Sequence, residues 1–285
     1  MKREISIPDL NIWRNSIDSV IRSIKKLESG DEVDLDARTN ADFKPQGIVM
    51  LTLLCQLIYN ETGNKVGLVG LKQETNDKLM SLGFFEFPFV RTNNKNNIFS
   101  IRIKKGASLT DTKLTLIKHP SDIVIFIDRI NEMLNISAHK AEPFRNIPYL
   151  IAELCDNSLE HSKGHNVMGE CFCAVQKYVY SGKNATSICI GDIGLGIRQH
   201  LRLVHTDIYD SDNYCIQQVL DGLTGRQDGS GGFGIPYIKD EVNKNKGEFH
   251  IRSGRGLVEF GLDNGIRKYG FITSFPGTQS LIIIK

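Results

Sequence analysis

The sequence lacks a long hydrophobic run, a dense set of cysteines and an excess of either charge. Its longest apolar stretch, residues 47–59, is interrupted by Thr52 and Gln56 and is shorter than the roughly 20 residues that span a bilayer. Six cysteines in 285 residues are too few for a disulfide scaffold. Thirty-five basic and 33 acidic residues give a formal net charge of +2, which does not indicate a nucleic-acid partner. We therefore expect neither a membrane protein nor a nucleic-acid-binding protein.

The composition is typical of a folded cytoplasmic protein. Hydrophobic residues make up 40% of the chain and charged residues 24%, which argues against disorder, and the length suits two domains. The basic residues near the N-terminus are not followed by an apolar segment, so we expect no signal peptide.

Hydrophobic periodicity divides the chain into four parts. Residues 1–30 contain one amphipathic helix candidate, and residues 31–105 alternate strand, helix, strand and helix. Residues 106–142 form a connector with one helix at about 121–134. In residues 143–285, several strands are gathered after helices, which predicts an α/β sandwich with a helix layer on a mixed or antiparallel sheet.

Cys171 and Cys173 lie in an alternating run that predicts a strand with both thiols on one face. No second cysteine or histidine pair follows at zinc spacing. We therefore interpret both cysteines as buried thiols.

The segment 151–162 contains the first candidate site residues. On a helix, Glu153, Asn157 and His161 recur every four residues and form one polar stripe. An amphipathic surface helix would show the same stripe, so the pattern alone leaves both interpretations open.

Two glycine-containing segments follow. An apolar strand runs into Asp192, Gly194 and Gly196, where a carboxylate could accept a hydrogen bond from a flat donor such as an adenine amino group. A surface turn is the alternative. Further along, six of the 13 residues from 222 to 234 are glycine, directly before a helix that we expect near Ile235. Glycine-rich backbone that opens a helix is suited to bind an anion, and a flexible loop is the alternative.

In this order, the motifs resemble the nucleotide site of the GHKL superfamily, over about residues 143–285. The N box corresponds to Glu153, Asn157 and His161, and the first glycine box to Asp192, Gly194 and Gly196. The second glycine box and the closing Gly-Thr strand add four residues: Gly231, Gly232, Gly234 and Thr278. The fold expected from this resemblance is a Bergerat-type α/β sandwich.

The resemblance also implies roles for these residues. Asn157 would hold Mg²⁺ between the phosphates of ATP, and Asp192 would bind the adenine amino group with help from Thr278. The second glycine box would close over the phosphates as part of a lid at about residues 198–230, where Arg226 is a candidate γ-phosphate contact. Glu153 would be the general base if ATP is hydrolysed.

The pattern of residues 31–105 resembles a STAS domain. Such a domain usually has an aspartate–serine pair before the glycine that opens its long helix, but Lys44, Pro45 and Gln46 precede Gly47 here. The missing hydroxyl predicts a degenerate docking or dimerising module, through which a partner protein or a second copy of the chain would bind.

Three functions remain open at this point. The first is a slow ATPase or an ATP-driven conformational switch that regulates a partner protein. The second is a protein-serine kinase like those that act on anti-sigma-factor antagonists, which the N box also resembles. The third is an ATP-binding adaptor without catalysis.

Overall fold

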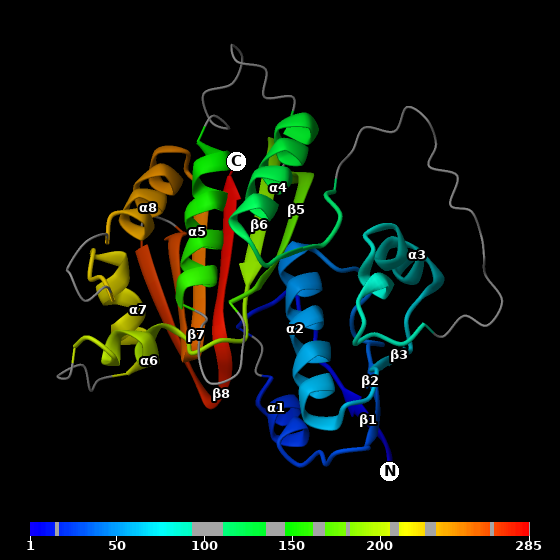
Figure 1. Ribbon diagram of the computed structural model, residues 1–285. Helices are drawn as coiled ribbons and strands as arrows, with labels where there is room; N and C mark the ends of the chain where they lie inside the picture. The colour runs from blue at the N-terminus through cyan, green and yellow to red at the C-terminus, as the bar shows by residue number, and fades with distance from the viewer. Residues whose placement is uncertain are drawn as a thin grey trace.

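The computed structural model describes residues 1–14, 17–92, 111–134, 146–161, 169–180, 183–205, 211–225, 232–262 and 265–284. These residues form an α/β protein with a three-stranded parallel sheet and a five-stranded antiparallel sheet (Figure 1). None of the described helices has both the length and the apolar character needed to cross a bilayer.

The smaller sheet belongs to the N-terminal part of the chain and has the order β1-β2-β3. Its strands are β1 (Lys2–Ser6), β2 (Glu32–Asp36) and β3 (Gly67–Val69). The helices of this part are α1 (Asp18–Ile24), α2 (Pro45–Thr62) and α3 (Gln73–Ser81), followed by the short 3₁₀ helix η1 (Phe84–Glu86). The strand–helix–strand–helix pattern predicted after residue 31 is therefore present, and α2 begins at the expected proline.

Strand β1 was not predicted from the sequence, which indicated only a helix in residues 1–30. The strand reads KREIS, and only Ile5 is buried within it, so it has almost no hydrophobic signal. It forms because its backbone pairs in parallel with β2, with Ile5 opposite Leu35. This long-range pairing has no local sequence signature.

The larger sheet has the order β4-β5-β6-β8-β7. Its strands are β4 (Thr115–Ile117), β5 (Cys171–Tyr180), β6 (Lys183–Gly191), β7 (Glu248–Leu262) and β8 (Gly265–Ile284). All four described strand pairs are antiparallel, so of the two expected arrangements, a mixed or an antiparallel sheet, the structure contains the antiparallel one.

The strands expected near the C-terminus are two long ones, β7 and β8. Glycines lie inside β7, where the register shifts between Ser253 and Gly254 and again between Gly254 and Gly256. Such irregularities accept glycine without ending the strand.

One face of the larger sheet is covered by helices of the C-terminal half (Figure 1). These are α4 (Pro120–Leu134) and α5 (Ile147–His161), with α7 (Asp212–Leu220) and α8 (Gly234–Lys244) beside them and the short α6 (Ile197–Arg202) next to α7. The expected helix layer is therefore present.

The other face of this sheet packs against the N-terminal part. Along β5, Phe172 and Ala174 join the hydrophobic cluster that includes α1 and α2, whereas Cys171, Cys173 and Val175 join the cluster under α5. Because successive side chains of a strand point to opposite faces, both faces of β5 are buried. Helix α2 thus packs between the two sheets, and the N-terminal part shares its core with the larger sheet.

Polar contacts also join the two parts. The Arg14 guanidinium forms a salt bridge with the Glu259 carboxylate at 2.6 Å. Arg252 is 1% exposed, lies 4.2 Å from the centre of the Phe271 ring and donates a hydrogen bond to the Trp13 carbonyl. Burial lowers the pKa of Arg252 to about 10. Separating a buried cation from its partners costs free energy. These contacts therefore favour one fixed arrangement of the N-terminal part on the larger sheet.

We predict that the two parts unfold together. Phe172 is buried and lies edge-on to Phe87 and Phe89 of the N-terminal part. Phe172→Ala should lower the free energy of unfolding by about 3–5 kcal/mol in a single transition, because the cavity lies in the shared core. Denaturant unfolding followed by fluorescence and circular dichroism measures this free energy.

The control Val124→Ala, at an exposed site, should change the free energy of unfolding by less than about 0.5 kcal/mol. Two separate transitions in the wild type would contradict the shared core.

Candidate functional site

A cavity of about 330 Å³ lies between α5, the loop after β6, the start of α8 and strands β7 and β8. Residues from all four sequence motifs line it. The predicted site residues in its wall are Glu153, Asn157, Asp192, Gly196, Gly232, Gly234 and Thr278. These residues are separated by up to 125 positions in the chain, and the fold brings them to one place.

Helix α5 presents its predicted polar stripe to this cavity. The Asn157 side-chain amide donates a hydrogen bond of 3.3 Å to Oε1 of Glu153, one helical turn earlier. Leu150 and Leu154 are buried on the core side, as predicted. His161 is the last residue of α5, and its side chain lies outside the described part of the structure.

Asp192 lies at the end of β6 and is 4% exposed. Its Oδ1 accepts hydrogen bonds from the backbone N–H groups of Gly194 at 2.8 Å and Thr278 at 3.3 Å. The Ser158 side chain also contacts the carboxyl group. Burial raises the pKa of Asp192 to about 7, although the two backbone hydrogen bonds act in the opposite direction. The carboxyl group is therefore able to change charge near neutral pH.

Two glycines allow close backbone contacts at the Asp192 end of the cavity. Gly277 has a φ of 75°, and a Cβ at this position would lie 2.1 Å from the Asp192 carbonyl oxygen. Gly196 has a φ of 76°, and a Cβ there would lie 2.8 Å from Oγ of Ser253. Side chains rarely adopt these conformations and would collide here. Gly277 was not among the predicted site residues, although it directly precedes Thr278.

The start of α8 meets Glu153. A Cβ at Gly234 would lie 1.7 Å from Oε1 of Glu153, so only glycine fits. No side chain caps the first turn of α8, and the turn contains no acidic residue. The first N–H groups of a helix are unpaired within it and form the positive end of its dipole. This end of the cavity is therefore suited to bind an anion.

Parts of the predicted lid lie outside the described residues. These include Arg226 and Gly231, so the structure does not locate either residue. Within the predicted lid range, the described residues form α6 and α7.

Several cavity residues were missed by the sequence analysis: Tyr149, Ser158, His200, Phe233 and Ser280. His200 is half-buried, and burial lowers its pKa. It lies on α6 directly after the Asp-x-Gly-x-Gly motif, which is the only sequence signal that could have indicated it. Among the described cavity residues there is no lysine or arginine, so little fixed positive charge faces the interior.

Comparisons with protein-family models, curated proteins and solved structures found no match to this chain. The cavity combines a buried carboxyl group, a carboxylate–amide pair and an open helix N-terminus. The buried carboxyl group is suited to bind a flat hydrogen-bond donor. The carboxylate–amide pair can hold a cation or orient water, and the helix N-terminus can bind an anion.

The burial of Asp192 predicts a pH-dependent stability difference between the wild type and Asp192→Asn. From about pH 4 to pH 7 the native carboxyl group holds a proton that the unfolded chain has lost, so wild-type stability falls as the pH rises. Asparagine keeps the Oδ1 acceptor but does not titrate. The stability of the variant relative to the wild type should therefore increase across this range, by up to about 4 kcal/mol.

Denaturant unfolding at several pH values measures this difference. The control is Asp156→Asn, an exchange of the same kind at an exposed position of α5. A wild-type–variant difference that stays constant from pH 4 to pH 7 would contradict the raised pKa of Asp192.

Proposed function

We propose that this chain is a GHKL-type protein that binds Mg-ATP in the cavity beside α5. It would use the nucleotide for slow ATP hydrolysis or as a conformational switch that regulates a partner protein. The observation that carries the proposal is the convergence of four separate sequence motifs on one cavity of about 330 Å³. This volume falls in the range of small-molecule sites.

The adenine ring would bind at the Asp192 end. Oδ1 of Asp192 already accepts two backbone N–H groups, so Oδ2 would accept the hydrogen bond from the adenine amino group, beside the Ser158 side chain that also contacts this carboxyl group. Gly277 gives the backbone a close approach to this carboxyl group, and Gly196 lies next to Gly277 and Ser253. Thr278, whose hydroxyl lies 3.3 Å from that of Ser253, adds a second polar group to this end of the cavity.

The phosphates would bind at the opposite end, near Glu153, Asn157 and the start of α8. Asn157 uses its amide N–H on Glu153, so its side-chain oxygen is available as the hard ligand that Mg²⁺ prefers. When bound, Mg²⁺ would neutralise phosphate charge. This contribution matters because the described cavity residues include no lysine or arginine. The first N–H groups of α8 would donate to phosphate oxygens.

Glu153 would accept the proton of the attacking water. Its hydrogen bond with Asn157 fixes the side chain, and the missing side chain at Gly234 leaves room for it. Only weak catalysis is expected without a partner, since no fixed cation among the described cavity residues faces the transferred phosphoryl group.

The first test of nucleotide binding uses Asp192→Asn. The variant keeps the Oδ1 acceptor but places an NH₂ group where the adenine amino group would donate, so ATP binding should be lost while the fold is retained. In a thermal unfolding assay, ATP at about a hundredfold excess over its dissociation constant should stabilise the wild type by about 2.7 kcal/mol and leave the variant unchanged.

Asp156→Asn is the control and should respond to ATP like the wild type. Measurements with and without Mg²⁺ separate the contribution of the metal to ATP binding from that of the adenine ring. The proposal fails if ATP stabilises Asp192→Asn as much as the wild type, or if it stabilises neither protein.

The second test concerns hydrolysis. Glu153→Gln removes the proton acceptor but keeps the shape and the hydrogen-bonding capacity toward Asn157. Phosphate release should fall by about 100-fold or more, whereas stabilisation by ATP should remain. Asp156→Asn again serves as the control. Unchanged turnover in Glu153→Gln would exclude Glu153 as the base.

The same assay separates the candidate functions. Free phosphate released by the chain alone supports an ATPase or switch, labelled phosphate on an added protein supports a kinase, and stabilisation by ATP without turnover supports an adaptor. The start of α2 argues against phosphorylation of this chain at that point. Pro45 and Gln46 are buried there, and the Lys44 backbone N–H is bonded to the Asn11 side chain.

A further inference from the structure

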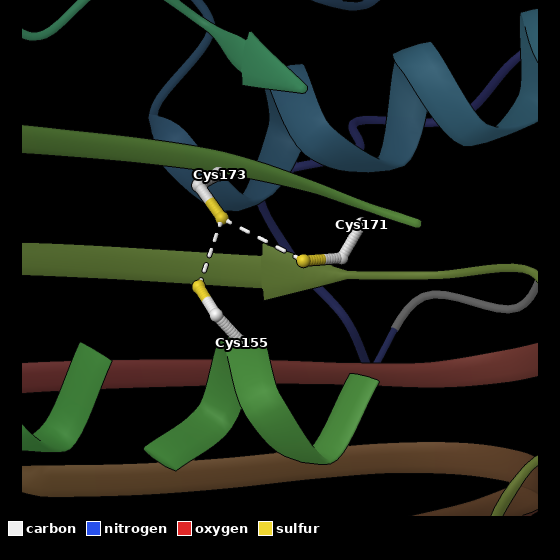
Figure 2. Close-up of side chains that lie close together, drawn as sticks. All are labelled: Cys155, Cys171 and Cys173. Carbon is white, nitrogen blue, oxygen red and sulfur yellow. Dashed lines mark hydrogen bonds between the residues drawn. The ribbon is translucent and has the colours of Figure 1, made fainter. Parts of the chain in front are cut away.

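Three of the six cysteines meet in the core beneath the candidate nucleotide cavity (Figure 2). Cys155 comes from α5, and Cys171 and Cys173 come from β5. The Sγ atoms of Cys155 and Cys173 are 3.5 Å apart, and those of Cys171 and Cys173 are 3.9 Å apart. All three sulfurs lie within 4.8 Å of one another, and all three residues are buried. We call this group the thiol cluster.

The spacing of the thiol cluster matches that of metal-bound thiolates. Two thiolates at about 2.3 Å from one metal ion, with a tetrahedral angle between them, are roughly 3.8 Å apart. Two of the contacts in the cluster are already close to this value, before any rearrangement around an ion. The geometry therefore requires only small side-chain shifts to place three sulfurs around one centre.

Metal ligation requires the thiolate form of cysteine, so an ion that entered the thiol cluster would displace the protons of the three thiols into solvent.

We propose that Cys155, Cys171 and Cys173 form a binding site for one soft, thiolate-binding metal ion, of the class that includes copper(I) and zinc(II). Sulfur ligands select such ions over Mg²⁺ or Ca²⁺. Among the described residues, no histidine, carboxylate or further cysteine joins the group. This ligand number suits a three-coordinate ion directly, whereas zinc would take a fourth ligand from solvent or from the nearby Ser158 hydroxyl, which contacts Cys171.

Hydrophobic packing accounts for the burial of the other cysteines but not for this convergence. Cys55, Cys189 and Cys215 are equally buried, yet none of them belongs to the group. Cys189 is the informative comparison, because it lies on β6 next to β5 but in the hydrophobic cluster on the opposite face of the sheet. The alternating sequence pattern indicates only the Cys171–Cys173 pair, because Cys155 comes earlier in the chain on a helix.

The test is a metal titration of the untagged, reduced full-length protein under anaerobic conditions. Copper(I) is added in competition with bicinchoninate, and zinc(II) in competition with 4-(2-pyridylazo)resorcinol. We expect one equivalent of at least one of these ions to be taken from the competing chelator. The ion that binds should also raise the unfolding temperature, because it binds the native state.

Single alanine variants identify the ligands. Cys155→Ala, Cys171→Ala and Cys173→Ala should each lose the tight equivalent, whereas the matched controls Cys55→Ala, Cys189→Ala and Cys215→Ala should retain it. Circular dichroism and thermal unfolding without metal identify any variant that fails to fold. X-ray absorption on the metal-loaded wild type gives a second measurement that needs no variant, and a shell of three sulfurs is expected.

The proposal is overturned if neither ion is retained against its chelator, or if binding persists undiminished in Cys173→Ala. It is also overturned if the metal in the wild type is surrounded by nitrogen and oxygen rather than sulfur. Because these measurements need no nucleotide, they are independent of the proposed ATP site.

Discussion

The burial of both faces of the five-stranded sheet is the constraint on which the rest of the structure depends. An antiparallel sheet commonly packs one face and exposes the other to solvent. Here the face toward α5 is covered by helices of the C-terminal half, and the face toward α2 by the N-terminal part. The alternation along β5, with Phe172 on one side and Cys173 on the other, shows both cores within three residues.

This arrangement also positions the candidate site. Strands β6 and β8 are paired up to Gly191 opposite Gln279. Asp192 and Thr278 therefore lie side by side where the pairing of these two strands ends. The backbone of Asp192 donates a hydrogen bond to the Thr278 carbonyl, which continues the pairing by one step. The Gln279 side chain then binds the Asp192 carbonyl. The position of the buried carboxyl group is thus determined by sheet pairing rather than by a flexible loop.

Much of this fold could be predicted from local pattern. The first helix expected within residues 31–105 is α2, the helix expected at 121–134 is α4, and the helix expected near Ile235 is α8. Helices α4 and α8 have clear helical periodicity, whereas α2 is buried on nearly all sides and is bounded by Pro45 and Gly63. Strand β1 and the antiparallel order of the larger sheet depend on pairing between distant segments, which local pattern does not encode.

The candidate site was predictable to the extent that its residues belong to motifs. Glu153 and Asn157 lie one turn apart within α5, and Asp192 directly follows β6, so the packing of α5 on the sheet brings the three residues to one cavity. His200 and Ser158 were missed because each lies beside a motif rather than within it. Cys155 was missed for a different reason. Its helix shows a polar stripe and an apolar face, and a cysteine on the apolar face looks like any other core residue until β5 is packed against it.

Helix α5 contributes residues to both the candidate nucleotide cavity and the thiol cluster, from different faces of the helix. Glu153 and Asn157 face the cavity, Leu150 and Leu154 fill the core, and Cys155 contacts the sulfur of Cys173 on β5. A 15-residue helix with this much of its surface in fixed contacts cannot rotate or slide without disturbing all of them. The residues of both proposed sites are therefore held by one fixed element, and Ser158, whose side chain contacts both Asp192 and Cys171, lies between them.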